Sequence, residues 1–394
     1  MSLKRFLNTA LLLCCAFAAC KRLEKDTPPA VLEAIAAVQQ KYCPDRRLCV
    51  FDISVQMRGA NLTLIGEVSD ASARREILQT VKAAVSNFKV EEEIRLLPDA
   101  SLGQKRFGLV RVSVANLRGK PAHAAELVHQ QLMGSVLQLL KTEGNWYYIQ
   151  AEDGYLAWAP KGSIYVTDSS GVAAWRASEL AAFEGMEGVL RTDPTAEAAP
   201  ISTLVLGCVA RKMAEVNDAN ASSKKKWLQL ELPDGRIGFV ERELMASVPE
   251  VFAPAQRSPH QVITQVRQFL GIPYLWGGTS INGFDCSGFT QMVFRLSGVS
   301  LLRDASQQAR QGGPVDPGDK FANLLPGDLL FFGDHPGKIT HVAISLGGAR
   351  FIHASDFVQI NSLNPEDDDY ADDRRNTFQF AKRFFTPAAS NGKH

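Results

Sequence analysis

The sequence lacks an excess of charge of one sign. Its 43 lysines and arginines nearly cancel its 42 aspartates and glutamates, which leaves a formal net charge of +1. Proteins that bind nucleic acid through their overall charge carry a clear excess of basic residues, so the composition argues against that class. With 394 residues and 45% hydrophobic content, the chain is expected to be a soluble globular protein of about two to four domains.

Metal-binding motifs are also missing from the sequence. It contains no Cys-x-x-Cys pair and no His-Glu-x-x-His segment, so no zinc site is expected. The acidic run at residues 366–373 is interpreted as an exposed loop, with a calcium loop as the alternative. No metal or organic cofactor is predicted.

The apolar run at the N-terminus is too short to span a membrane comfortably. Lys4 and Arg5 precede this run at residues 6–19, and small residues stand directly before Cys20. This order is typical of a secretory signal peptide. It also resembles a bacterial lipobox, although Phe17 stands where leucine is commoner, and Cys20 would then be the lipidated first residue.

The lipobox resemblance implies a signal peptide at residues 1–19 and a tether at residues 20–29. A plain signal peptide with an unmodified Cys20 is the alternative. Lys21 and Arg22 follow Cys20, with no aspartate of the kind that retains known lipoproteins in the inner membrane. We therefore expect a periplasm-facing lipoprotein of the cell envelope, placed in the outer membrane.

The seven cysteines differ in their surroundings. Cys43 and Cys49 flank a short proline-containing loop and could form a disulfide in an oxidising compartment. Two reduced cysteines at these positions are the alternative. Cys208 lies in an apolar stretch and is expected in a core, and Cys286 remains unpaired.

Residues 271–290 carry the strongest chemical signal. A turn-rich segment leads into Asp-Cys-Ser-Gly, and an apolar run with helical spacing follows, so Cys286 is expected where a loop becomes a helix. The N–H groups at a helix start favour a thiolate. His341 and His353 lie in two later apolar segments and could supply a base. A cysteine at a helix start with a histidine on a later strand is the papain-type arrangement for acyl transfer.

Six motifs in one order resemble the NlpC-type cell-wall cysteine peptidases over residues 255–388. The motifs are PYLWGG, FDCSGF, RDASQQ, LPGDLLFF, HVAISLG and FIHAS. The resemblance implies a papain-like domain in which Cys286 is the nucleophile, His341 the base and His353 the residue that orients the base. It also implies substrate-binding or oxyanion-binding roles for Tyr274, Trp276, Asp285 and Ser287. A buried structural cysteine with two core histidines is the alternative.

The spacing of the two histidines can be checked against strand geometry. A two-residue turn that pairs Leu346 with Ala349 would place His341 and His353 on opposite faces of the sheet. A three-residue loop that pairs Leu346 with Arg350 would place them on one face, because side chains alternate along strands. A catalytic triad of Cys286, His341 and His353 needs both histidines on one face, so it predicts the three-residue loop.

Short strands between glycines and prolines predict two small barrels, at residues 101–166 and 167–252. The first resembles a bacterial Src-homology-3-like domain, which in one peptidase subfamily walls the active site. This resemblance implies that Glu126, Tyr155 and Asp304 hold the free amino terminus of a murein peptide, and burial behind the barrel would strengthen the Glu126 contact.

Two other features of the sequence concern the surroundings of Asp304 and the second barrel. Ala305 stands where family members have serine, a departure that concerns the contacts of its neighbour Asp304. In the second barrel, residues 177–186 are expected to be helical.

Residues 30–100 resemble the small BON domain of bacterial envelope proteins. The alternation of helical and strand periodicity predicts a helix–strand–strand–helix–strand unit. The expected elements are a helix at 31–42, strands at 48–57 and 61–68, a helix at 73–85 and a strand at 88–97. No residue there suggests chemistry, so a spacer is expected.

The sequence therefore predicts an α+β multidomain protein with a papain-like catalytic domain at residues 253–388. The resemblance implies hydrolysis of the γ-D-glutamyl bond to diaminopimelate or lysine in murein peptides with free N-terminal L-Ala. A hydrolase of intact cell wall, endopeptidase or amidase, and a non-catalytic wall-binding lipoprotein are the alternatives. The expected partners are murein peptide or peptidoglycan and the membrane, with the oligomeric state left open.

Overall fold

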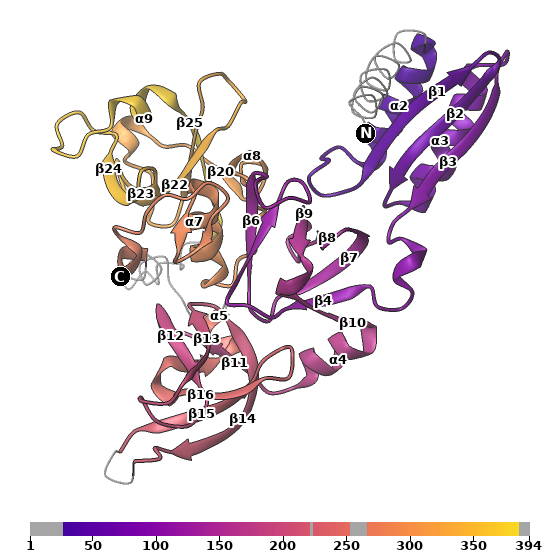
Figure 1. Cartoon of the computed structure of the whole chain (residues 1–394). Coiled ribbons are helices and arrows are strands. Elements are labelled where there is room, and N and C mark those ends of the chain that lie inside the picture. The colour runs from indigo at the N-terminus through magenta and orange to yellow at the C-terminus, as the bar shows by residue number, and fades with distance from the viewer. Residues whose placement is uncertain (1–26, 221–223, 253–265, 386–394) are drawn as a thin grey trace, which may run out of the picture. The chain divides into compact units, whose positions relative to one another are not determined.

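The computed structural model describes residues 27–220, 224–252 and 266–385 and divides the chain into two compact units, Met1–Gly103 and Gln104–His394 (Figure 1). The predicted signal peptide, Cys20 and most of the tether lie outside the described residues. A short 3-10 turn at Arg267–Phe269 leads into the C-terminal part of the chain.

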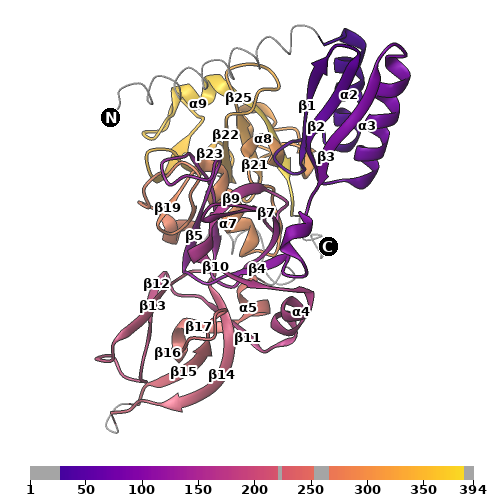
Figure 2. The same ribbon diagram turned by 45° about the vertical axis from the view of Figure 1, so that its right-hand side comes forward.

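The N-terminal unit has the predicted order of elements. Helices α2 and α3 lie side by side against the three-stranded sheet β1-β2-β3, and their apolar faces form one core with it (Figure 2). β1 and β2 pair antiparallel, whereas β2 and β3 pair parallel because α3 connects them. Asp70 caps α3 by accepting hydrogen bonds from the backbone of Ser72 and Ala73. The bounds are α2 Pro29–Tyr42, β1 Phe51–Arg58, β2 Asn61–Val68, α3 Ala71–Ala84 and β3 Lys89–Leu96.

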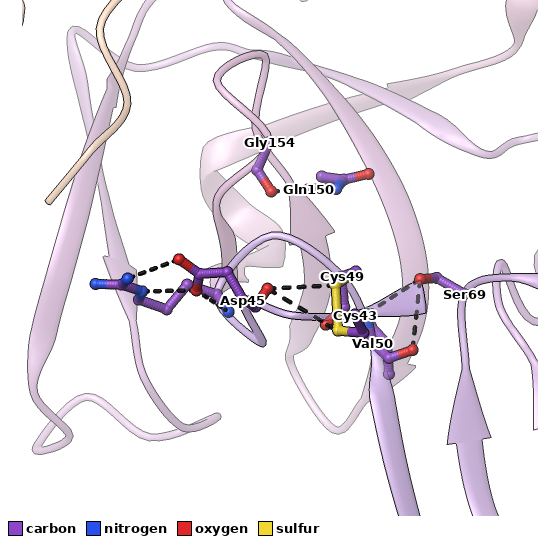
Figure 3. The surroundings of a disulfide bond; sticks show 8 residues. Cys43, Asp45, Cys49, Val50, Ser69, Gln150 and Gly154 are labelled. Atoms are coloured by element: carbon purple, nitrogen blue, oxygen red, sulfur yellow. Dashed lines mark hydrogen bonds and ion pairs between the residues drawn. A yellow bond between two sulfur atoms is a disulfide. The ribbon is translucent and has the colours of Figure 1, made fainter. Parts of the chain in front are cut away.

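The loop between α2 and β1 contains a disulfide. Cys43 and Cys49 are joined, with their Cα atoms 5.6 Å apart (Figure 3). Within the loop, Arg47 Nε donates to Asp45 Oδ1 at 2.8 Å. Of the two states that the sequence left open, the structure contains the disulfide.

The two predicted barrels are seven-stranded antiparallel sheets with one topology. The first barrel has the order β10-β4-β7-β8-β9-β5-β6, and the second has β17-β11-β14-β15-β16-β12-β13, which is the same order shifted by seven strands. The first contains β4 Phe107–Val110, β5 Val114–Arg118, β6 Leu127–Leu132, β7 Val136–Glu143, β8 Trp146–Gln150, β9 Leu156–Pro160 and β10 Ile164–Thr167. The second contains β11 Leu180–Phe183, β12 Glu187–Arg191, β13 Pro200–Val205, β14 Val209–Asn217, β15 Lys226–Glu231, β16 Ile237–Glu241 and β17 Met245–Ser247. The fainter second repeat is therefore a structural copy of the first.

The helix expected at residues 177–186 is wrong. Helix α4 spans Ser169–Ala177 and ends where that segment begins, while Leu180–Phe183 forms strand β11. This strand pairs with β14 on one side and β17 on the other. Pairing on both edges outweighs the helix propensity of a short alanine- and leucine-containing stretch.

The C-terminal part contains a six-stranded antiparallel sheet, ordered β20-β25-β21-β22-β23-β24. Helix α7 packs against β22 and β23 and carries buried aromatic and aliphatic side chains into the core. The bounds are α5 Val248–Phe252, β18 Thr279–Ser280, β19 Gly283–Phe284, α7 Cys286–Arg295, α8 Ala305–Gln308, β20 Gly313–Val315, β21 Leu329–Phe332, β22 His341–Gly347, β23 Arg350–Ala354, β24 Val358–Ser362, α9 Asp372–Thr377 and β25 Phe378–Arg383.

The β22–β23 hairpin has the register that the triad requires. Ser345 lies opposite Phe351, which is the register obtained by pairing Leu346 with Arg350. The connection itself differs from the expected loop, because Gly347 pairs with Arg350 and Leu346 forms a bulge. A two-residue turn alone would place His341 and His353 on opposite faces of the sheet. The extra residue in the bulge returns them to the same face.

Across residues 27–220, 224–252 and 266–385, the structure contains no helix with the length and apolar character needed to cross a membrane.

Candidate active site

Cys286 is the first residue of α7, as the sequence predicted. Asp285 caps the helix, and its Oδ1 accepts from the backbone N–H of Gly288 at 2.6 Å. A Cβ atom at Gly288 would come within 2.0 Å of the carbonyl oxygen of Gly278. Glycine therefore lets the helix start approach the preceding loop and fixes where the thiol emerges.

The Asp285 carboxylate is held by a buried arginine that sequence reasoning missed. Arg303 Nη1 and Nη2 lie 3.0 Å and 2.5 Å from its two oxygens, and the arginine side chain is 1% exposed. Gly277 also donates its backbone N–H to Oδ2 at 2.9 Å. A two-pronged ion pair of this kind fixes orientation as well as charge. Asp285 thus supports the loop and the helix start, and its contact with a peptide stays a prediction.

His341 and His353 contact each other on one face of the sheet. His341 Nε2 lies 2.8 Å from His353 Nδ1, and their ring planes are nearly perpendicular at 87°. Helix α7 packs against β22, and the backbone of Val342, next to His341, acts to lower the pKa of the Cys286 thiol, which places the start of β22 near the thiol. The structure therefore brings the three predicted catalytic residues into one buried cluster.

Burial keeps this cluster neutral. Burial, followed by the charge of Asp285, raises the pKa of the Cys286 thiol to about 12. Burial also lowers the pKa of His341 well below its ordinary value and that of His353 to about 4. The resting site is a thiol beside two neutral imidazoles, whereas the helix start alone had suggested a thiolate.

Tyr274 lies beside the nucleophile as a neutral hydroxyl. Burial and the neighbouring Cys286 and Asp285 raise the pKa of its phenol. A phenol that stays protonated can donate a hydrogen bond to developing negative charge. The structure thus gives Tyr274 the proton that its expected oxyanion role requires.

The first barrel meets the catalytic part through the residues expected to bind an amino terminus. The Tyr155 hydroxyl donates to Asp304 Oδ2 at 3.3 Å, and Trp276 Nε1 donates to Glu126 Oε1 at 2.7 Å. Tyr155 is buried, but Glu126 is exposed, so the expected burial of Glu126 behind the barrel is wrong. Both carboxylates nevertheless lie at contacts between the barrel and the catalytic part.

Comparison with known proteins agrees with this geometry. The NlpC/P60 family model matches residues 271–374, which include all three residues of the buried cluster. Residues 271–374 are an NlpC/P60 cysteine peptidase domain. The model of the bacterial dipeptidyl-peptidase Sh3 domain matches residues 117–164, within the first barrel.

The chain is also similar to individual proteins. It is 28% identical to dipeptidyl-peptidase 6 of Lysinibacillus sphaericus over 274 residues, which cover 68% of this chain and 96% of that protein. It is 49% identical to gamma-D-glutamyl-L-lysine dipeptidyl-peptidase of Bacillus subtilis over 118 residues, 29% of this chain and 38% of that one. An NlpC/P60 family crystal structure from Bacillus cereus superimposes with a TM-score of 0.59 at 22% identity, covering 70% of this chain and 99% of that chain, and shows the shared fold.

A polar socket joins the first barrel to the NlpC/P60 domain. Gln130 Oε1 accepts from the backbone N–H of Thr279 and from Ser280 Oγ, both at 2.9 Å, and Thr279 Oγ1 donates to the Gln130 carbonyl at 3.0 Å. All three residues are buried. Sequence reasoning missed this socket, because its partners are about 150 residues apart and neither carries a motif.

Among the described residues, no group of three or more histidine, cysteine, aspartate or glutamate side chains is arranged to hold a metal ion. The BON-like resemblance of residues 30–100 lies outside both family matches and stays a prediction, as does the lipidation of Cys20, which lies outside the described residues.

Proposed function

We propose that this protein hydrolyses the γ-D-glutamyl bond to lysine or diaminopimelate in murein peptides that carry a free N-terminal L-Ala. The observation that carries this proposal is the meeting of Tyr155 from the first barrel with Asp304 beside the Cys286 site. The name of the Bacillus subtilis relative, a gamma-D-glutamyl-L-lysine dipeptidyl-peptidase, supports the same substrate class.

The proposed chemistry begins from the neutral thiol. As the Cys286 sulfur bonds to the scissile carbonyl carbon, its proton passes to His341. Tyr274 and the backbone N–H groups at the start of α7 stabilise the oxyanion. The bond between carbon and the leaving nitrogen then breaks while His341 returns its proton to the amine. Water hydrolyses the thioester with His341 again as base, which releases L-Ala–D-Glu and restores the thiol.

The selection of a free amine is assigned to Glu126, Tyr155 and Asp304. An ammonium group needs acceptors, and two carboxylates supply charge-assisted ones. Tyr155 holds Asp304 from the barrel side, while Trp276 holds Glu126 from the catalytic side. Each carboxylate is thus positioned by the opposite domain, which favours recognition of one end of a short peptide.

We also propose that the mature chain is a lipoprotein anchored at Cys20 in the outer membrane, with the BON-like domain as a periplasmic spacer. The disulfide between Cys43 and Cys49 supports an oxidising compartment. Mass spectrometry of the mature N-terminus, compared between the wild type and Cys20→Ser, tests the anchor. An unmodified Cys20 in the wild type would contradict it.

The substrate proposal is tested with L-Ala–γ-D-Glu–diaminopimelate, the corresponding lysine peptide, their N-acetylated forms and whole sacculi, with products followed by mass spectrometry. We expect cleavage of the free-amine peptides, and loss of that cleavage in Cys286→Ala. Cleavage of blocked peptides or sacculi would instead support a hydrolase of intact wall. If the wild type cleaves none of them, the non-catalytic wall-binding alternative is favoured.

A further inference from the structure

Asn361, on strand β24, contacts His353 of the histidine pair. Its Oδ1 lies 2.9 Å from His353 Nε2. Its Nδ2 donates to the backbone carbonyl of Asp369 at 3.1 Å. Because a carbonyl can only accept, this second contact fixes which end of the amide is nitrogen. The oxygen of Asn361 must therefore face His353.

The orientation of this one amide determines the position of each proton in the pair. An oxygen acceptor requires a hydrogen on His353 Nε2, and a neutral imidazole carries only one N–H, so His353 Nδ1 must accept. His341 Nε2, at 2.8 Å from that nitrogen, must then donate. The lone pair of His341 is left on Nδ1, the nitrogen that does not contact His353.

We propose that Asn361 is a positioning residue that fixes the tautomers of His353 and His341, so that His341 Nδ1 is the base that receives the Cys286 proton. This inference rests on the proposed function. It adds Asn361 as a fourth member to the chain of contacts. Asn361 touches no reacting atom and acts through His353.

The acidic loop supplies the outer support. The Asp369 carbonyl that holds Asn361 also accepts from the backbone N–H of Ser362 at 2.9 Å. The Asp369 carboxylate pairs with Arg350 of β23, and Asp367 Oδ2 accepts from Ser362 Oγ at 2.6 Å. The run at residues 366–373 is thus tied to β23 and β24 and holds the asparagine amide in place.

The deduction requires neutral imidazoles at neutral pH. Burial lowers the pKa of His353 to about 4, and Arg374 acts in the same direction. The Asn361 contact, Asp373 and Asp356 act in the opposite direction. Burial also lowers the pKa of His341, helped by His353 and Arg374. Both rings therefore carry a single N–H under the conditions of the reaction.

Two matched variants of the full chain test the role of Asn361 in turnover. Asn361→Leu and Asn361→Asp both lose the donor to Asp369, but only aspartate keeps an oxygen acceptor for His353. We expect Asn361→Leu to lower kcat by at least about tenfold, the size of one lost hydrogen bond, with KM unchanged. We expect Asn361→Asp to stay within about threefold of the wild type. Equal losses in both variants would indicate a purely structural role and overturn the proposal.

Nitrogen NMR of histidine-labelled full-length protein gives a readout that needs no substrate. In the wild type, we expect His341 and His353 both to carry hydrogen on Nε2. In Asn361→Leu, we expect a population with hydrogen on His353 Nδ1. Hydrogen on His341 Nδ1 in the wild type would overturn the tautomer assignment whatever the activity. If the expected tautomers are found but no murein peptide is cleaved, the proposed function fails while the assignment stands.

Discussion

Cys286 differs from the reactive cysteine expected at an exposed helix start. Helix N–H groups and Arg303 favour the thiolate, but burial and the negative charge of Asp285 outweigh them. In the proposed reaction, the thiolate is therefore generated during attack, when His341 removes the proton. This gives the site a reactivity toward small electrophiles that differs from that of a preformed thiolate–imidazolium pair.

Alkylation kinetics should show this difference. We expect the rate of inactivation by iodoacetamide to rise about tenfold per pH unit between pH 7 and 9.5, because the thiolate fraction rises by that factor below the pKa. Residual activity and the mass of the Cys286 peptide measure the rate. Cys208 is a poor competitor because it is only 1% exposed, and alkylation there is distinguished by the mass of its own peptide. A rate that is already constant from about pH 5 upward would contradict the neutral resting state.

The buried histidines should make stability depend on pH. His353 has a pKa of about 4 in the folded chain, against about 6.5 in an unfolded one, so the unfolded state binds more protons between these values. Stability is then complete above pH 6.5 and falls as the pH drops toward 4, by about 3 kcal/mol for this residue. His353→Gln, which does not titrate, should flatten this decline in denaturant unfolding measured from pH 7.5 to 4. An unchanged slope would show that His353 has the same pKa in the folded and unfolded chain.

The residues that could be predicted from the sequence are those inside local motifs. Cys286, His341 and His353 each stand in a short recognisable segment. Arg303 and Asn361 were missed because their roles come from partners brought close by the fold. Arg303 adjoins the predicted Asp304 and is itself fully buried. An arginine within an otherwise recognised motif was the one available signal for it.

At the level of elements, the start of α7 depends on a buried ion pair. Removing one partner of such a pair leaves the other charge buried and unpaired, which costs about 3–5 kcal/mol. We therefore expect Arg303→Met to lower the free energy of unfolding by that amount, measured by urea denaturation, and to reduce activity as the helix start loosens. Arg176→Met is the matched control, because Arg176 pairs with Glu152 at 62% and 50% side-chain exposure, and exposed pairs contribute below about 1 kcal/mol. Equal losses of unfolding free energy in the two variants would show that the buried Arg303 pair stabilises the protein no more than the exposed Arg176 pair.

Element order was easier to predict than the way elements pair. The N-terminal unit follows its periodicity closely, since β2 spans Asn61–Val68 as the pattern indicated and α3 begins at Ala71, two residues before the expected start at residue 73. Residues 180–183 became a strand because both edges pair, which no local window reveals. The triad predicted that the two histidines lie on the same face of the β22–β23 hairpin. The bulge at Leu346 that places them there was not predicted.

At the scale of the whole molecule, the residues assigned to the reaction all lie in the unit Gln104–His394. We expect a chain that begins at residue 104 to cleave a free-amine murein peptide with kcat/KM within about threefold of the mature protein, because loss of a separate compact unit leaves these contacts intact. Steady-state kinetics on both chains measure this. A large loss in the truncated chain would assign the N-terminal unit a direct part in catalysis.

The hydrogen bonds of the Gln130 socket limit how the catalytic domain can be used in an engineered fusion protein. The loop that leads to the nucleophile is buttressed by a neighbouring domain, through hydrogen bonds that would be left unsatisfied in isolation. The catalytic domain alone is therefore not expected to function when it is fused to a new targeting domain. A working chimera would have to carry the first barrel with it, or rebuild a glutamine-bearing strand against Thr279.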